Sequence, residues 1–134
     1  MSSNLTRAFE SSPFALTLLR ENLAESKNFY GKGLGLTVVY EDDVSAVYRC
    51  GQTVINLLAD SQANELLEPA KLAPVNSGVR AVYTLRCSDV DAAVSELAAA
   101  GVELLNGPID RPWGVRTASF QDPSGHTWEL ANHV

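Results

Sequence analysis

The chain has 134 residues, of which 46% are apolar and 19% are charged, and its 10 basic and 16 acidic side chains give a net charge of −6. A chain of this length buries roughly two-thirds of its unfolded surface, so it forms a core without disulfides or structural metal, and a wholly disordered chain is excluded. The acidic balance also lacks the basic stripe of a nucleic-acid binder, so no nucleic-acid partner is expected.

The sequence carries no sign of export or membrane insertion. No stretch approaches the roughly 20 apolar residues that span a bilayer, and the first residues lack the apolar segment of a signal peptide. These features predict a cytoplasmic protein without a membrane partner. Cys50 and Cys87 lie in apolar runs with neither metal-binding nor disulfide spacing, which predicts two buried, reduced thiols.

The first half of the chain predicts a β-α-β-β-β module. Residues 1–12, rich in Ser, Asn and charge, are expected to form a loose tail, and the module is expected over residues 13–67. Asn22, with Glu25 three residues later, indicates the start of a helix, and the glycines of YGKGLG indicate its end. The expected strands are 14–20, 36–41, 44–50 and 53–59.

The second half repeats this order after a linker. Residues 68–78 contain two prolines and a glycine and predict the linker, and residues 79–134 predict a second module within one structural domain. The expected elements are a strand at 79–87, a helix capped by Ser88 or Asp89 and closed by Gly101, a strand at 102–107, a loop at 108–114 and strands at 115–121 and 126–131. Asn22 and Asp89, like Leu18 and Leu85, are 67 residues apart, which indicates an architectural repeat.

Three segments, LRENLAESKNFYGKGLGL, SDVDAAVSELAAAGVEL and PWGVRTASFQDPSGHTWEL, make the chain similar to a known group of proteins. It resembles the vicinal oxygen chelate superfamily over residues 13–131; this superfamily includes glyoxalase I, extradiol dioxygenases and bleomycin-resistance proteins. The resemblance implies an α+β fold of two paired β-α-β-β-β modules, with curled mixed sheets around a shared pocket and helices outside. Because such folds host many chemistries, function has to be argued from the pocket residues.

The positions that hold metal in some members carry two aliphatic side chains, one neutral amide and one carboxylate here. The resemblance places Ala15, Asn56, Val82 and Glu129 at these four positions, which belong to the first and last strand of each module. A catalytic zinc site needs at least three nitrogen, thiolate or carboxylate ligands, and a non-haem iron site needs two histidines and a carboxylate. We therefore expect no metal and no cofactor.

Strand alternation predicts which side chains replace the metal site. Successive strand residues point to opposite faces, so a pocket with mostly apolar walls and a few polar groups is expected. Trp113 lies in a loop, and the resemblance to drug-binding members implies that it borders the pocket and stacks on flat ligands. The candidate ligand-binding residues are Trp113, Asn56, Glu129, Arg86, Leu58, Thr84, Thr17 and Tyr48.

Each candidate also has a purely structural interpretation. Glu129 could pair with Arg86 or Arg116, Asn56 could satisfy backbone groups, and the threonines suit strands for packing reasons. Trp113 could pack under its own loop or at a subunit interface. Trp128 is expected in the core.

Four functions remain open from the sequence. The favoured one is a metal-free protein without catalytic residues that binds and sequesters a bulky aromatic natural product or antibiotic, with or without positive charge, as in drug-binding resistance proteins. The alternatives are a metal-independent lyase or isomerase with Glu129 as base, a metal-dependent glyoxalase or dioxygenase, and a ligand-free interaction module. The sequence does not identify the ligand.

Exposed sheet edges predict a homodimer. In proteins that resemble this one, modules from two chains complete each pocket, although one chain's two modules could also form it. His133 has the strand parity of Glu129 and could lie at the pocket edge or in a frayed terminus.

Overall fold

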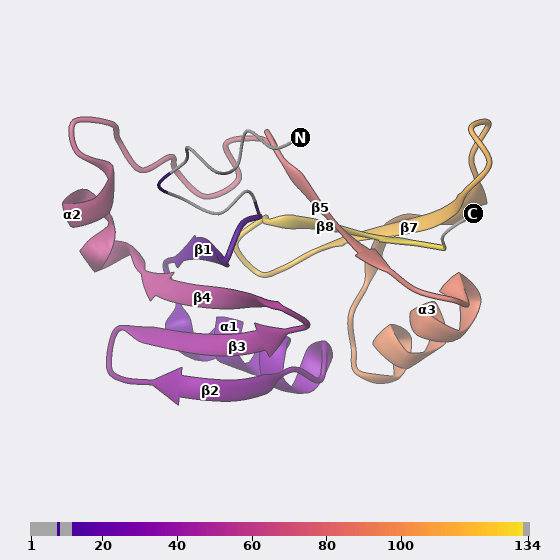
Figure 1. Ribbon diagram of the computed structural model, residues 1–134, viewed down its shortest axis with the longest axis horizontal. Coiled ribbons are helices and arrows are strands. Elements are labelled where there is room, and N and C mark those ends of the chain that lie inside the picture. Colours follow the sequence, from indigo (N-terminus) through magenta and orange to yellow (C-terminus); the bar gives the residue numbers. More distant parts are fainter. Residues whose placement is uncertain (1–7, 9–11, 133–134) are drawn as a thin grey trace.

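A computed structural model describes residue 8 and residues 12–132 of the chain. The tail expected at 1–12 therefore lies largely outside the described residues, as does His133. The fold is α+β, with two four-stranded mixed sheets that have the same strand order (Figure 1). None of the described helices has the length and apolar character needed to cross a membrane.

The first module follows the predicted order. Its elements are β1 (Ala15–Arg20), α1 (Leu23–Asn28), the π-helical turn η2 (Phe29–Gly33), β2 (Thr37–Glu41), β3 (Ser45–Cys50) and β4 (Thr53–Ala59). The strands are ordered β1-β4-β3-β2, with β1 and β4 parallel. The helix begins where the sequence predicts, because the Asn22 side chain accepts a hydrogen bond from the Glu25 N–H at 3.0 Å.

The second module repeats this arrangement. Its elements are β5 (Val82–Arg86), α3 (Val90–Ala99), β6 (Leu104–Asp110), β7 (Arg116–Gln121) and β8 (Thr127–Ala131), with the strands ordered β5-β8-β7-β6. Of the two predicted caps it is Asp89 that accepts from the Ala92 N–H, at 3.0 Å. The prediction that a loop begins at residue 108 is wrong, because β6 continues to Asp110. A register shift between Asn106 and Ile109 accommodates Pro108 within the strand.

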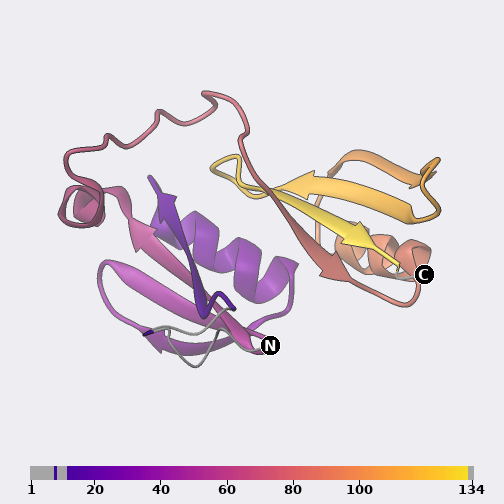
Figure 2. The same cartoon turned by 45° about the horizontal axis from the view of Figure 1, so that its top comes forward.

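Two short helices that the sequence did not predict precede the linker. They are η3 (Asp60–Gln62) and α2 (Ala63–Leu67), and the chain then runs without helix or strand to β5. Figures 1 and 2 show this segment passing from one module to the other along one side of the molecule. Cys50 and Cys87 are free thiols, and they are half-buried where full burial was predicted.

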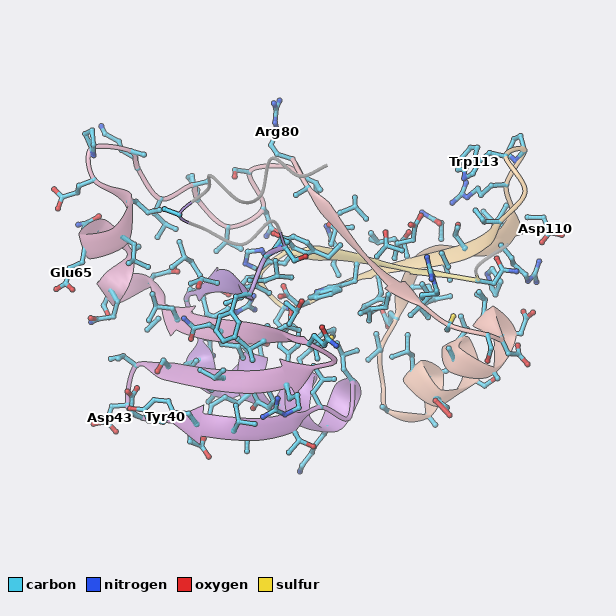
Figure 3. The ribbon with its side chains drawn as sticks, viewed as in Figure 1. Tyr40, Asp43, Glu65, Arg80, Asp110 and Trp113 are labelled. Atoms are coloured by element: carbon cyan, nitrogen blue, oxygen red, sulfur yellow. The ribbon has the colours of Figure 1, made fainter. Side chains whose placement is uncertain are left out.

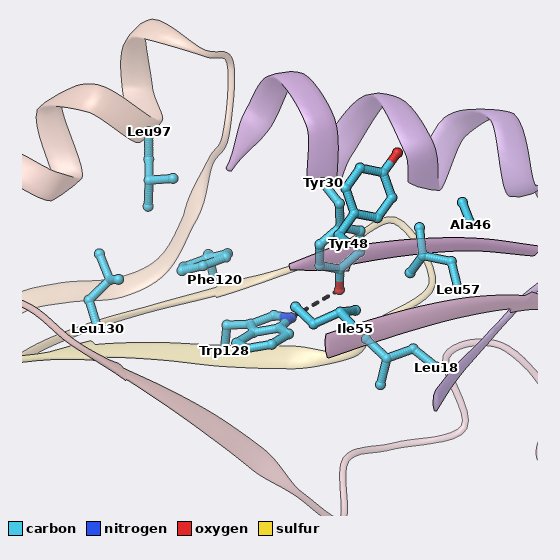
Figure 4. Close-up of a cluster of buried hydrophobic side chains, with 10 residues drawn as sticks. All are labelled: Leu18, Tyr30, Ala46, Tyr48, Ile55, Leu57, Leu97, Phe120, Trp128 and Leu130. Atoms are coloured by element: carbon cyan, nitrogen blue, oxygen red, sulfur yellow. Dashed lines mark hydrogen bonds between the residues drawn. The ribbon is translucent and has the colours of Figure 1, made fainter. Parts of the chain in front are cut away.

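One hydrophobic core runs through both modules (Figure 4). The ring of Tyr30 meets that of Trp128 at a centroid distance of 6.2 Å, and Phe29 meets Phe120 at the same distance. The buried members are Leu18, Tyr30, Ala46, Tyr48, Ile55, Leu57, Leu97, Phe120, Trp128 and Leu130. The prediction that Trp128 lies in the core is confirmed. Among the described elements, α1 and α3 lie on the core side of their sheets (Figures 1 and 2). The opposite side of each sheet is here called the open face.

Candidate functional site

The open face of the first sheet brings three predicted residues together. Thr17 on β1 is the register partner of Asn56 on β4, and the Asn56 Nδ2 donates to the Thr17 Oγ1 at 3.3 Å. Leu58 lies two residues after Asn56 and so shares its face. Thr17 is exposed and the other two are half-buried. This face therefore presents a small polar pair beside an apolar side chain.

The open face of the second sheet carries the equivalent pair. Thr84 on β5 is the register partner of Glu129 on β8, and the Thr84 Oγ1 donates to the Glu129 Oε1 at 2.9 Å. Thr84 stands 67 residues after Thr17, so the repeat extends to these side chains. Arg86 shares the face by alternation and is exposed.

The interpretation of Glu129 as a partner of Arg116 is wrong. Arg116 pairs instead with Asp91 and Asp110, at 3.0 Å each. Within the described part of the chain, no arginine or lysine nitrogen lies within 4.0 Å of the Glu129 carboxylate. Glu129 is therefore a half-buried carboxylate held by one neutral hydroxyl.

Trp113 stands at the tip of the β6–β7 hairpin with 69% of its surface exposed (Figure 3). The interpretation that it packs under its own loop is therefore wrong. The guanidinium carbon of Arg111 lies 6.0 Å from the centre of the Trp113 ring. Sequence reasoning missed Arg111, although an arginine two residues before a loop tryptophan was a signal to test.

Arg111 is tied to the open face of the second sheet. Its Nε donates to the Thr117 Oγ1 at 2.8 Å, and its Nη2 donates to the Asn106 Oδ1 at 3.0 Å. Thr117 shares the face of Ser119 by alternation, and Ser119 is the register partner of Glu129. The Arg111 side chain thus lies on the same face as the Thr84–Glu129 pair.

The placement of Tyr48 among the ligand-binding residues is corrected by the structure. Tyr48 is the register partner of Ile55 on the core side, is 4% exposed, and donates its hydroxyl to the Lys27 carbonyl at 3.2 Å. Desolvation raises the pKa of its hydroxyl, as does the nearby charge of Glu41. Tyr48 therefore belongs to the core.

Tyr40 is the aromatic side chain on the open face of the first sheet. It is the register partner of Val47, which in turn pairs with Asn56. A register shift between Val38 and Tyr40 changes the strand parity and turns Tyr40 to this face, where it is 56% exposed. Its hydroxyl donates to Asp42 at 2.8 Å.

The four positions that hold metal in some relatives have a donor set that does not fit a metal centre. The side chains of Ala15 and Val82 have no donor atom, so only the neutral amide of Asn56 and the carboxylate of Glu129 could ligate an ion there, fewer than the three ligands of a catalytic zinc site. Among residues 8 and 12–132, no three His, Cys, Asp or Glu side chains are grouped so that they could hold an ion. That the protein carries no metal stays a prediction.

A cavity of about 460 Å³ lies where the two modules and the linker meet. It is lined by Thr17, Glu21, Asp60, Gln121, His126 and the linker residues 71–79, among others. The His126 Nε2 lies 3.1 Å from the Leu19 carbonyl oxygen. Burial, together with the charge of Glu21, raises the pKa of the Asp60 carboxyl. Apart from Thr17, the predicted ligand-binding residues lie outside this cavity. Tyr48 lies in the core, and the others lie on the open faces and the β6–β7 hairpin.

The profile of the Glyoxalase/Bleomycin resistance protein/Dioxygenase superfamily matches residues 14–130. The chain belongs to this superfamily. The resemblance seen in the sequence and the fold of two paired β-α-β-β-β modules are thereby confirmed.

Solved structures of superfamily proteins superpose on this member. A glyoxalase/bleomycin resistance protein/dioxygenase from Nocardioides is similar with a TM-score of 0.84 at 25% identity, over 98% of this chain and 89% of that one. A glyoxalase-related enzyme from Fulvimarina pelagi is similar with a TM-score of 0.79 at 23% identity, over 92% of this chain and 89% of that one. A lactoylglutathione lyase from Agrobacterium tumefaciens is similar with a TM-score of 0.73 at 18% identity, over 92% of this chain and 94% of that one. The last two similarities show the fold alone. No curated protein matches the chain.

Proposed function

We propose that this superfamily member is a metal-free protein that binds and sequesters a planar aromatic small molecule, such as a natural product or antibiotic, in the cytoplasm. The observation that carries the proposal is Trp113, which is largely exposed and lies beside Arg111, a side chain anchored on the same open face as Thr84 and Glu129. An aromatic ligand stacked on this ring contributes about 0.5–1.5 kcal/mol beyond the area it buries. The Thr84–Glu129 pair on this face would offer directional contacts to the same ligand.

The binding unit in this proposal is a homodimer. The open face of the first sheet in one chain would lie against the open face of the second sheet in its partner, which gives two equivalent sites by twofold symmetry. Exposed apolar side chains on both faces support this pairing, since Tyr40 is 56% and Val82 is 54% exposed. Contact between the faces would bury both side chains and close the site.

Glu129 supports a second candidate function, a metal-independent lyase or isomerase reaction. Thr84 occupies one carboxylate oxygen, and the other has no hydrogen-bond donor from the described residues. An unpaired, half-buried carboxylate can accept a proton from a bound substrate. Turnover lost in Glu129→Gln with ligand affinity retained would favour this candidate.

Fluorescence titration tests the binding proposal. Purified protein is titrated with aromatic antibiotics, among them anthracycline, glycopeptide-like and enediyne-derived compounds. Trp113→Ala should weaken a binding compound by about 2–4 kcal/mol, which is roughly 30- to 700-fold. Calorimetry gives the affinity of the variant, since the tryptophan that remains, Trp128, is buried.

Phe14→Ala is the matched control. Phe14 is also an exposed aromatic side chain, but its strand parity is opposite to that of Ala15 and Thr17 on the open face. Its replacement should leave affinity unchanged. Equal affinity of the wild type and Trp113→Ala would contradict the proposal.

A further inference from the structure

The guanidinium of Arg111 is held in place by neutral groups only. Thr117 and Asn106 accept its two hydrogen bonds, and the Trp113 ring lies beside it. Arg20 and Arg116 both have aspartate partners, whereas no carboxylate of the described residues lies within 4.0 Å of Arg111. A half-buried positive charge therefore stands on the open face with its counter-charge missing from this part of the chain.

Three of the five N–H donors of Arg111 are not used by these two bonds. Guanidinium donors form a planar fork that matches a carboxylate or sulfonate, and such charge-assisted bonds are stronger than neutral ones. Because two anchors already fix the fork, binding an anion costs little side-chain freedom.

The position of Trp113 restricts what carries the anion. The guanidinium of Arg111 lies 6.0 Å from the centre of the Trp113 ring, and Trp113 is still 69% exposed. A flat ligand ring can cover this exposed surface while a substituent at its edge reaches the guanidinium. The next arginine along the hairpin, Arg116, does not compete for the anion because Asp91 and Asp110 neutralise it.

We propose that the ligand bound at Trp113 is an aromatic anion, with a carboxylate or sulfonate held by Arg111. This inference rests on the proposed function, and it names the class of ligand. It differs from the cationic ligand with which the overall charge of −6 is also compatible, because the charged group beside the stacking surface, Arg111, is positive. Arg111 is thus the residue that determines specificity at this end of the site.

Three probes with the same ring and different charge test the inference. Naphthoate, naphthamide and naphthylmethylamine are titrated into the full chain by calorimetry. Naphthoate should bind best, and its affinity should fall as salt is raised. Arg111→Gln should weaken naphthoate about 10- to 100-fold and change naphthamide less than about threefold. Arg111→Lys keeps the charge and should retain a preference for naphthoate over naphthamide.

Arg80→Gln is the matched control, because Arg80 is exposed and stands on the linker side of the molecule, away from the hairpin (Figure 3). It removes the same charge and should leave all three affinities unchanged. Thermal unfolding shows whether Arg111→Gln keeps the fold. If this variant does not fold, the affinities of Arg111→Lys and the salt dependence of naphthoate binding test the role of the charge.

The outcomes separate this inference from the proposed function. If naphthamide binds as well as naphthoate and is lost in Trp113→Ala, the binding site stands and the anion preference is overturned. If Arg111→Gln folds and binds naphthoate as the wild type does, the role of Arg111 is also overturned. If none of the probes binds the wild type, the inference and the site at Trp113 both fail.

Discussion

Arg20 and Asp122 form a fully buried ion pair, 2.6 Å between Nη1 and Oδ2, that joins the two modules across 102 residues of sequence. Arg20 ends β1, and Asp122 begins the turn between β7 and β8. The same Asp122 oxygen accepts from the Tyr30 hydroxyl at 2.6 Å, and the Trp128 indole N–H donates to that hydroxyl at 3.0 Å. The Arg20 Nε donates to the Ser26 hydroxyl. One carboxylate thus connects β1 and η2 of the first module to the second.

Asp122→Asn should be strongly destabilising. It removes the charge that compensates the buried Arg20, and breaking a buried pair in this way costs about 3–5 kcal/mol. Urea unfolding measures the loss. Asp110→Asn is the control, because Asp110 also pairs with an arginine but its side chain is 82% exposed, so less than about 1 kcal/mol is expected. Equal costs for the two variants would contradict the role of burial.

Stability should fall in alkali because of Tyr30. Burial, followed by the charge of Asp122 and the hydrogen bond to it, raises the pKa of Tyr30 well above its ordinary value of 10.0. The unfolded chain therefore loses this proton near pH 10 while the folded chain keeps it. The contribution of the protonated Tyr30 hydroxyl to stability is fully present below about pH 10. Above that pH the free energy of unfolding falls by about 1.4 kcal/mol per pH unit.

Comparison with Tyr30→Phe isolates this effect. The variant lacks the hydroxyl, so its free energy of unfolding, measured in urea between about pH 8 and 11, should depend less steeply on pH. Contributions from the other titrating groups are common to both proteins and cancel. Parallel pH profiles would show that Tyr30 ionises equally in both states.

Gly107→Ala should disrupt the second sheet more than Gly114→Ala. Both glycines have positive φ, +91° and +97°, so either change costs on the order of 1–3 kcal/mol in backbone strain. Only at Gly107 would the new Cβ meet backbone, 2.5 Å from the Thr117 carbonyl oxygen, whereas Gly114 has open space. Overpacking should add about 1–3 kcal/mol at Gly107. Equal melting temperatures would argue against this close approach.

If the protein forms the proposed homodimer, light scattering at micromolar concentration should give a mass of about 29 kDa, twice the chain mass of 14.4 kDa. Val82→Asp should shift the protein toward the monomer, because it places a charge on the open face of the second sheet that would be buried in the dimer. Val75→Asp, at an exposed linker position, should not. A wild-type particle of one chain mass would refute the dimer.

Elemental analysis of untagged protein should find far less than one equivalent of zinc, iron, manganese or nickel. Ala15 and Val82 offer no donor at the positions assigned from the family. Combining Ala15→His, Asn56→Glu and Val82→His supplies nitrogen and carboxylate donors there and should create zinc binding. One tightly bound transition metal per wild-type chain would overturn the prediction, and a triple variant that takes up no zinc would argue against the assigned positions.

The two modules were predictable because each repeats the same local signals. Asn22 and Asp89 begin the helices by accepting backbone N–H groups, and these signals act within one turn. Alternation within a strand likewise predicted that Thr17 and Thr84 share the open faces with their partners. These features depend only on neighbours in sequence or on a regular register.

The missed features depend on irregular or distant contacts. Tyr40, and not Tyr48, reaches the open face because a register shift in β2 changes the parity, and no residue type marks that shift. Arg20 occupies the core side of β1, where an aliphatic residue is expected, because Asp122 arrives from the far end of the chain. The orientation of the Arg111 side chain depends on its hydrogen bonds to Asn106 on β6 and Thr117 on β7, so it cannot be predicted from the residues next to it in sequence.

The contacts of Tyr30 with Trp128 and of Phe29 with Phe120 mean that neither half of the chain can cover its own aromatic surface. Each half is complete as a pattern of strands and helix, but α1 and α3 do not cover all of the apolar side of their sheets, and these aromatic rings pack against the other half. The protein should therefore unfold cooperatively, in a single transition. Cleavage in the linker would leave two fragments that fold only when they associate with each other. The sequence pattern repeats once per module, whereas folding requires both modules together.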